Sequence, residues 1–194
     1  MTVTPKPIKL IVGLGNPGEE YEQTRHNAGF RTINELANRF GVSYWKNQCG
    51  AQVAHATFDG QRIVLAMPQS FMNCSGGPVS KLLNTYDIDI TELLVVHDEL
   101  DIPAGDIRVK VGGGHAGHNG LRSIIDKCNS RDFNRLRFGT GRPPGKMDVA
   151  TYVLQQLKGE QAVMFNQTVH NAADACEIIL EHGVIFARNK INTK

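Results

Sequence analysis

A histidine at position 26 is the residue of this chain best suited by type and position to acid–base chemistry. His26 lies within residues 24–29 (TRHNAG), directly before a stretch with helical spacing. A helix N-terminus lowers the pKa of an imidazole, so His26 would stay neutral and able to accept a proton at neutral pH. An acidic partner would then have to stabilise the imidazolium. The ordinary alternative for an isolated histidine here is a capping or surface role.

Acidic residues that could supply this partner follow the buried apolar run at residues 93–96. Asp98 comes almost directly after this run, and Asp101 is three residues further on. Because the carboxyl ends of strands in open α/β sheets meet where sites assemble, Asp98 could orient a histidine and stabilise its charged form. The alternative is that Asp98 and Asp101 only cap the turn that leads to Pro103. Spacing along the chain leaves both interpretations open.

A glycine turn at residues 13–18 (GLGNPG) follows the first strand-like run and formally matches the dinucleotide-binding fingerprint. Pro17 interrupts the turn, and Glu19, with two further glutamates close behind, would repel a pyrophosphate. We therefore interpret this segment as a tight turn at the end of a strand that presents Asn16.

The most unusual stretch is residues 112–120 (GGGHAGHNG), with five glycines among nine residues. Glycine at this density predicts a flexible loop or a close approach of backbone to a ligand. A plain linker would explain the glycines but not His115, His118 and Asn119 among them. A metal-dependent hydrolase would need ligands from this region, namely His97, Asp98, His115 and His118, but their spacing matches no familiar ligand pattern.

Basic residues are concentrated between positions 105 and 150, where nine Lys and Arg stand against four Asp and Glu, although the net charge of the chain is only +2. Arg108 and Lys110 are two apart on an expected strand, so they share a face that could clamp phosphates. The pattern predicts a salt-sensitive surface for a nucleic-acid backbone. The alternatives are an unevenly charged solvated surface, or an RNA-binding module without catalysis.

The order of expected elements favours an α/β fold, a sandwich around a mixed sheet, in a single domain spanning residues 1–194. No apolar run is long enough to cross a membrane, and four scattered cysteines suggest reduced thiols in a cytoplasmic protein. The Asp-Gly pair at residues 59–60 predicts a hairpin. We expect strands at 8–14, 51–57, 61–67, 93–96, 106–111 and 133–138, and helices at 28–40 (with Asn27 as N-cap), 78–86, 119–128, 149–157 and 160–181.

Taken together, these segments resemble the bacterial peptidyl-tRNA hydrolase family over nearly the whole chain. The resemblance rests on several motifs in the family's order: IKLIVGLGNPG, TRHNAG, PQSFMNCSG, VVHDELD, GGGHAGHNGLRSI and FNRLRFGTGRP. It implies a three-layer α/β/α sandwich with a mostly parallel twisted sheet, monomeric and without metal or cofactor. It also implies hydrolysis of the ester that joins a peptide to the 3′ end of tRNA, with peptidyl-tRNA as the partner.

The resemblance also implies roles for particular residues. His26 matches the family's catalytic histidine and Asp98 its acidic partner, and the two form the expected catalytic pair. The expected substrate-binding residues are the amides Asn16, Asn73 and Asn119 and the channel residues Tyr21, Phe71 and Met72. Arg108, Lys110 and Arg137 fall at basic positions associated with tRNA; Arg108 stands where a lysine is common. The segments around residues 45–50 and 139–146 follow the family less closely.

Overall fold

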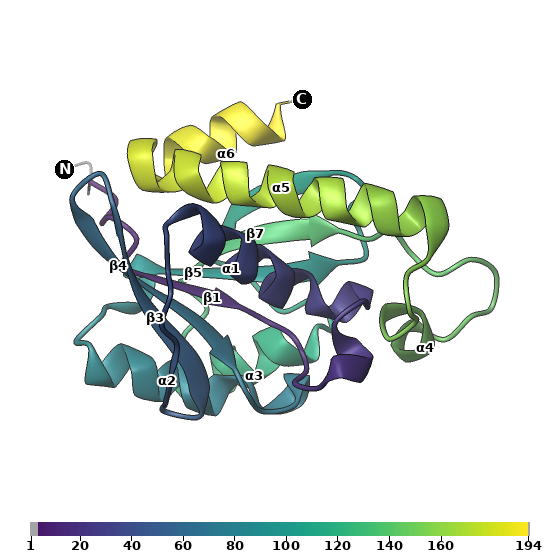
Figure 1. The fold of residues 1–194 in the computed structure, drawn as a ribbon, viewed down its shortest axis with the longest axis horizontal. Helices are drawn as coiled ribbons and strands as arrows, with labels where there is room; N and C mark the ends of the chain where they lie inside the picture. Colours follow the sequence, from purple (N-terminus) through teal and green to yellow (C-terminus); the bar gives the residue numbers. More distant parts are fainter. Residues whose placement is uncertain (1–3, 194) are drawn as a thin grey trace.

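The computed structural model describes residues 4–193, which form one seven-stranded sheet between two layers of helices (Figure 1). The strands are β1 (Leu10–Gly13), β2 (Lys46–Gln48), β3 (Ala51–Phe58), β4 (Gln61–Pro68), β5 (Leu93–Glu99), β6 (Ile107–Val111) and β7 (Asn134–Gly139). The α-helices are α1 (Ala28–Arg39), α2 (Gly76–Thr85), α3 (Asn119–Cys128), α4 (Val149–Val153), α5 (Gly159–His182) and α6 (Val184–Asn192). Short 3₁₀ turns are η1 (Glu19–Tyr21), η2 (Arg25–Asn27), η3 (Met72–Cys74) and η4 (Ile90–Glu92).

The strands follow the order β2-β3-β4-β1-β5-β7-β6 across the sheet. The four central strands, β4, β1, β5 and β7, are parallel, whereas β3 and β6 run against their neighbours. The hairpin between β3 and β4 turns at Asp59 and Gly60, both with positive φ, as the Asp-Gly pair predicts. The carboxyl ends of the central strands therefore meet at one edge of the sheet.

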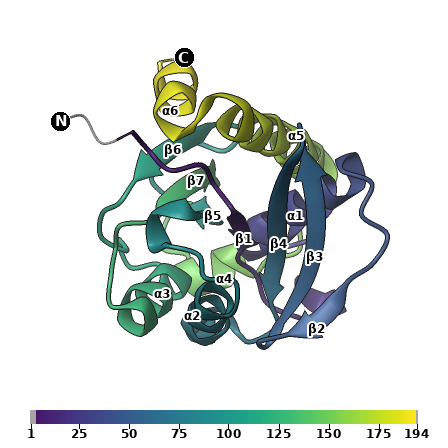
Figure 2. The ribbon, with the colours of Figure 1, turned by 90° about the vertical axis from the view of Figure 1, so that its left-hand side faces the viewer.

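Helices cover both faces of this sheet, because side chains along the central strands alternate between two apolar layers. Ile11 and Leu94 face α1, α5 and α6, whereas Val12 and Val95 face α2 and α3. Figure 2 shows the two layers on opposite sides of the sheet. The predicted mixed, mostly parallel α/β/α sandwich is confirmed. Within residues 4–193, no helix is both long and apolar enough to cross a membrane, and the four cysteines are free thiols.

Three elements differ from the prediction. The edge strand β2 and the last helix α6 were not expected, and α4 ends at Val153 instead of continuing to residue 157. After α4 the chain pairs with the segment before η2: Gln156 bridges Thr24, and the Leu157 N–H donates to the Gln23 carbonyl. Asn27 precedes α1, but its side chain makes no capping hydrogen bond.

The glycine turn after β1 serves close packing against α1. A Cβ on Gly13 would lie 2.2 Å from the Gly29 carbonyl oxygen, and one on Gly29 would lie 2.2 Å from the Leu14 nitrogen. A Cβ on Gly15 would meet the Phe30 ring at 2.6 Å. The first two glycines of the formal fingerprint thus let α1 approach β1. This packing holds the turn that carries His26 over the end of the sheet.

Candidate active site

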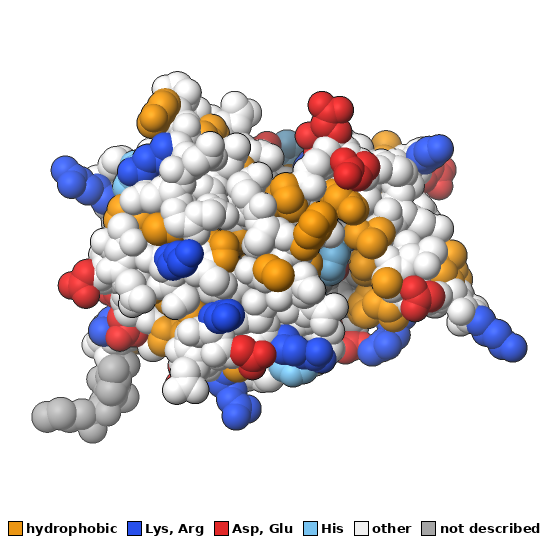
Figure 3. All heavy atoms as spheres, turned by 90° about the horizontal axis from the view of Figure 1, so that it is seen from below, with side chains coloured by type: hydrophobic (Ala, Val, Ile, Leu, Met, Phe, Trp, Pro, Cys, Tyr) orange, Lys and Arg blue, Asp and Glu red, His pale blue; other side chains and the backbone are white. Residues whose placement is uncertain are grey.

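A cleft of about 780 Å³ opens at the edge where the central strands end. It is bounded by the ends of β1 and β5, the turns η1, η2 and η3, the start of α3, and α4. Apolar side chains gather beside a histidine on the face seen in Figure 3. All eight residues predicted for catalysis and substrate binding line this cleft, namely Asn16, Tyr21, His26, Phe71, Met72, Asn73, Asp98 and Asn119.

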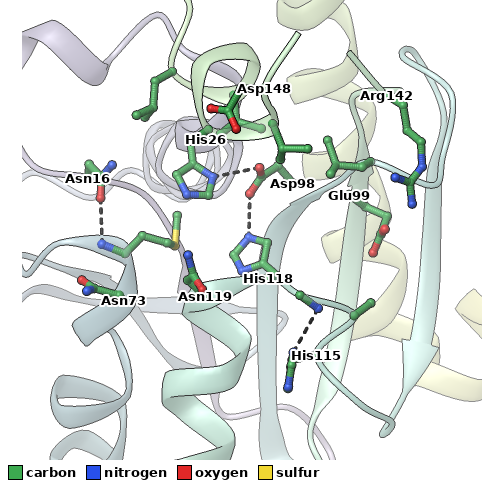
Figure 4. Close-up of a pocket in the computed structure, with 18 of the residues that line it drawn as sticks. Asn16, His26, Asn73, Asp98, Glu99, His115, His118, Asn119, Arg142 and Asp148 are labelled. Carbon is green, nitrogen blue, oxygen red and sulfur yellow. Dashed lines mark hydrogen bonds and ion pairs between the residues drawn. The ribbon is translucent and has the colours of Figure 1, made fainter. Parts of the chain in front are cut away.

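His26 and Asp98, 72 residues apart in sequence, form a hydrogen bond in this cleft. The His26 Nδ1 atom lies 2.9 Å from Asp98 Oδ2, and the carboxylate is only 4% exposed. A second histidine, His118, places its Nε2 atom 2.8 Å from Asp98 Oδ1 (Figure 4). Asp98 therefore bonds an imidazole through each oxygen and does not cap the following turn. In that turn, the Asp101 N–H donates to Glu99 Oε1 instead.

The hydrogen-bond partners define the protonation of both rings. His118 is the N-cap of α3, and its Nδ1 accepts hydrogen bonds from the N–H groups of Gly120 and Leu121. Its proton must therefore be on Nε2, which donates to Asp98. His26 likewise donates from Nδ1 to Asp98, which leaves Nε2 as a free acceptor. In Figure 4 this nitrogen points away from Asp98 toward the side of the cleft that holds Asn16.

Electrostatics within the pair favour a charged complex. Burial disfavours the charged imidazolium, but the negative charge and hydrogen bond of Asp98 together raise the pKa of His26 above 6.5. Burial likewise opposes ionisation of Asp98, yet His26 and His118 hold its pKa well below the usual 3.8. The lowered pKa expected for His26 from a helix terminus is therefore wrong in sign. The effect of Asp98 on the pKa of His26 is larger than the effect expected from a position just before a helix.

Asn16 is oriented by two neighbouring segments. Its side-chain Oδ1 accepts from the Met72 N–H at 2.7 Å, which leaves Nδ2 as the remaining donor of this amide. The buried Asn27 side chain pairs with the Asn16 backbone: Oδ1 accepts from the N–H at 2.9 Å and Nδ2 donates to the carbonyl at 3.0 Å. Asn27 thus joins the turn that carries His26 to the turn that carries Asn16.

The remaining predicted residues differ in exposure. Asn73 and Asn119 are exposed, whereas Met72 is buried and Phe71 is 61% exposed. Figure 4 shows Asn119 below His26, with Asn73 further from Arg142. The other wall of the cleft comes from α4 and includes Val149, Val153 and Leu154, which the sequence analysis did not assign to the site.

The predicted basic residues lie beside the cleft and do not line it. Arg108 and Arg137 are directly opposite each other in the β6–β7 ladder, and Lys110 is on the same face. Arg137 pairs with Glu99 at 3.3 Å, and Glu99 does line the cleft. Arg108 approaches Asp106 at 3.9 Å. The three cations therefore share one face, which adjoins the cleft through Glu99.

The structure does not bring the four alternative metal ligands together. His115 accepts a hydrogen bond from the Gly117 N–H, and buried His97 bonds the Asp98 carbonyl. Among residues 4–193 the candidate cluster is instead His26, Asp98 and His118, whose ligand atoms lie within 4.8 Å of one another. This set does not fit a metal ion: coordination through His118 Nε2 would require the ring proton to move to Nδ1, which already accepts hydrogen bonds from two N–H groups.

The role of His118 was not predicted from the sequence, although a signal for it was present. The helix was correctly predicted to begin at Asn119, so position 118 is the N-cap. A histidine there can satisfy the first N–H groups with one nitrogen and leave the other as a directed donor. The roles of Asn27, which joins two turns of the site, and of α4, which forms a wall of the cleft, were also not predicted, although an N-cap and a helix were expected there.

A histidine–aspartate pair in a cleft at the strand ends of a three-layer α/β fold is the arrangement of an active site. Comparison with known proteins identifies the family. Residues 10–194 match the family model described as peptidyl-tRNA hydrolase. The curated peptidyl-tRNA hydrolase of Syntrophotalea carbinolica is 44% identical over 187 residues, which cover 96% of this chain and 98% of that protein. That of Chloroflexus aurantiacus is 46% identical over 184 residues, covering 94% and 98%. The chain belongs to the peptidyl-tRNA hydrolase family.

Solved structures agree with this assignment. The crystal structure of peptidyl-tRNA hydrolase from Acinetobacter baumannii superposes with a TM-score of 0.88 at 39% identity, covering 95% of this chain and 94% of that one. A purine nucleoside phosphorylase from Toxoplasma gondii, at 10% identity and a TM-score of 0.51, shares the fold alone.

Proposed function

We propose that this chain hydrolyses the ester bond between the peptidyl or N-acyl-aminoacyl group and the 3′ ribose of tRNA, so that free tRNA returns to translation. The observation that carries this proposal is the His26–Asp98 hydrogen bond, which leaves His26 Nε2 free beside a cleft lined by three asparagines. Membership of the peptidyl-tRNA hydrolase family supports the substrate class.

In the proposed mechanism, His26 Nε2 takes a proton from water, and the hydroxide attacks the ester carbonyl. Asp98 stabilises the imidazolium, as the raised pKa of His26 indicates. When the tetrahedral intermediate collapses, the bond from the carbonyl carbon to the ribose oxygen breaks, and His26 returns its proton to that oxygen. The products are tRNA and a free peptide, whose new carboxyl group loses its proton to solvent, and no metal or cofactor takes part.

Neutral amides suit the remaining tasks, because they can orient a carbonyl without introducing charge. Asn16, whose Oδ1 is already bonded, can offer only Nδ2 to the substrate or to the developing oxyanion. Exposed Asn73 and Asn119 hold water and the peptide backbone. His118 is a positioning residue, because its bond to the second carboxylate oxygen prevents Asp98 from rotating away from His26.

The two ends of the substrate meet different surfaces in this proposal. Tyr21, Phe71 and Met72 form an apolar channel for the peptide, opposite α4. Arg108, Lys110 and Arg137 contact tRNA phosphates, so binding weakens with salt. The continuous sheet, with α5 and α6 packed on it, supports one domain, and in this proposal that domain acts as a monomer. A cytoplasmic location follows from the proposed role in translation.

The test compares N-acetyl-aminoacyl-tRNA with unblocked aminoacyl-tRNA, each with and without a chelator. We expect release of free tRNA from the blocked substrate, unaffected by the chelator. His26→Ala should lose about 10²–10⁴-fold in kcat and still bind tRNA, because it removes the general base alone. RNA binding without turnover by the wild type would reduce the protein to a binding module. Near-normal turnover by His26→Ala would refute the mechanism.

A further inference from the structure

The glycine-rich loop 112–118 starts beside the beginning of β7 and ends near the end of that strand. Its start follows β6, where Val111 pairs with Asn134 at the beginning of β7. Its end brings His118 to Asp98, which pairs with Phe138 near the end of β7. The loop therefore passes along the length of β7. Most residues of this loop are glycines, so the loop has few side chains that could bond its own carbonyl groups. Carbonyls that are buried beneath the loop therefore need hydrogen-bond donors from elsewhere.

Arg135 in β7 supplies these donors. Its side chain is almost fully buried, at 2% exposure, an unusual environment for an arginine. The two terminal nitrogens donate to consecutive loop carbonyls, Nη1 to that of Gly114 and Nη2 to that of Gly113. The guanidinium carbon lies 4.5 Å from the centre of the Phe133 ring. Since the guanidinium fork is planar and rigid, both carbonyls are held in one geometry.

Neighbouring groups restrict the same part of the loop. The Gly112 N–H donates to the Phe133 carbonyl at 3.0 Å. Gly113 has a φ of 108°, and a Cβ there would lie 2.7 Å from Lys110 Cε. Burial lowers the pKa of Arg135 to about 10, so the guanidinium keeps its charge at neutral pH. Gly113, at the start of the loop, is thus bonded by Arg135 and closely approached by the side chain of Lys110.

We propose that Arg135 is a positioning residue, which fixes the start of the loop 112–118 and thereby the locations of His118 and Asn119 in the cleft. The His118 cap on α3 fixes the end of the loop, and Arg135 fixes its start. Without Arg135, the glycines between the two ends regain conformational freedom, and that freedom must be lost again to form the His118–Asp98 bond. The kinetic consequence rests on the proposed function, whereas the structural consequence does not.

Arg135→Lys tests this proposal, because it keeps the charge and removes the fork. We expect kcat on N-acetyl-aminoacyl-tRNA to fall about tenfold with KM within about twofold, as displacement of site residues costs turnover more than binding. Amide exchange of residues 113–117 should accelerate about tenfold, with α2 unchanged. Arg62→Lys is the matched control: Arg62 is an exposed strand residue in β4, and its replacement should change nothing.

A second substitution separates loop order from charge. A Cβ on Gly114 would meet no atom within 4 Å, and its φ is not in the left-handed region, so Gly114→Ala fits and stiffens the loop. In the Arg135→Lys background, we expect Gly114→Ala to restore part of kcat and to slow loop exchange.

Three outcomes would overturn the proposal: wild-type kcat and exchange in Arg135→Lys, no rescue by Gly114→Ala, or unfolding of the whole protein. A wild-type protein that does not hydrolyse the blocked substrate would refute the proposed function instead, and the exchange measurement would still test Arg135.

Discussion

Two histidines beside Asp98 show how one carboxylate can be surrounded by imidazoles with opposite properties. His26 lies at the cleft and bonds a carboxylate oxygen, and its pKa is raised above 6.5. His97 is the sequence neighbour of Asp98, but it lies on the buried side and bonds the backbone carbonyl of Asp98 at 2.8 Å. Burial and the nearby His118 lower the pKa of His97 to about 3. Proximity in sequence therefore says little about which histidine the acid serves.

The difference arises from which atoms face each ring. His26 gains a charged acceptor that compensates for its burial, whereas His97 gains only a neutral carbonyl. The His97 Nε2 atom and the Arg135 Nε atom are buried without a hydrogen-bond partner among the described residues. The cleft side of Asp98 thus stabilises the charged imidazolium of His26, whereas the buried side disfavours the charged form of His97.

The largest expected effect on activity comes from removing the negative charge of Asp98, which His26 faces and His97 does not. Asp98→Asn should lower kcat about 10²–10⁴-fold, because the imidazolium loses its counter-charge and His26 can adopt the wrong tautomer. Rates measured from pH 5 to 9 in wild type should fall as pH drops through the raised pKa of His26, with a midpoint above 6.5. In Asp98→Asn burial acts unopposed, so the residual rate should have its midpoint below 6.5.

The control for this profile is the stability of Asp98→Asn across the same pH range, since loss of folding at low pH would imitate a titration. A midpoint that does not move between wild type and Asp98→Asn would show that Asp98 does not set the proton affinity of His26.

Features predicted correctly from the sequence share a local origin. The central strands are apolar runs, α3 begins at Asn119 as expected, and the Asp-Gly turn is encoded in two adjacent residues. The convergence of Asn16 and Asp98 at one cleft follows from a general property of parallel sheets, whose strand ends meet. Asn119 reaches the same cleft only because the loop 112–118 leads back from the end of antiparallel β6. The motifs quoted from the family provided the rest of the predicted site.

Features that were missed depend on tertiary contacts. The strand β2 is three polar residues long and pairs only with β3, so it has no apolar signature. In α6, Asn192 bonds both the N–H and the carbonyl of Val109, and this contact protects the edge strand β6. Arg135 was counted among the basic residues of positions 105–150, which were interpreted as a nucleic-acid surface, because no pattern in the sequence distinguishes a buried arginine from an exposed one.

An intermediate effect is expected from His118, which bonds Asp98 Oδ1 and whose ring lies near the rings of both His26 and His97. His118→Ala should lower kcat about tenfold by releasing Asp98 Oδ1, and it should cost about 1 kcal/mol of stability by removing the α3 cap. His118→Asn separates these roles, because Asn is a good N-cap but is too short to replace the Nε2 donor. We expect stability near wild type in urea unfolding with kcat still reduced. Wild-type kcat in His118→Asn would remove His118 from the site.

The smallest effect on activity, and a distinct effect on stability, is expected on the buried side. His97→Asn keeps a donor for the Asp98 carbonyl, so kcat should stay within about threefold of wild type. A histidine whose pKa is depressed on folding binds a proton in the unfolded state first, so wild-type stability should fall as pH drops from 6.5 toward 3.

His97 contributes at most about 1.4 kcal/mol per pH unit to this slope, the limit for one proton, and His97→Asn should flatten it by a corresponding amount. Urea unfolding at pH 7 and pH 5 measures the difference, with His170→Asn as the control, because His170 is exposed and pairs with Glu35 far from the cleft. Equal slopes in wild type and His97→Asn would mean that His97 is protonated within the fold, and the contrast between the two sides of Asp98 would be lost.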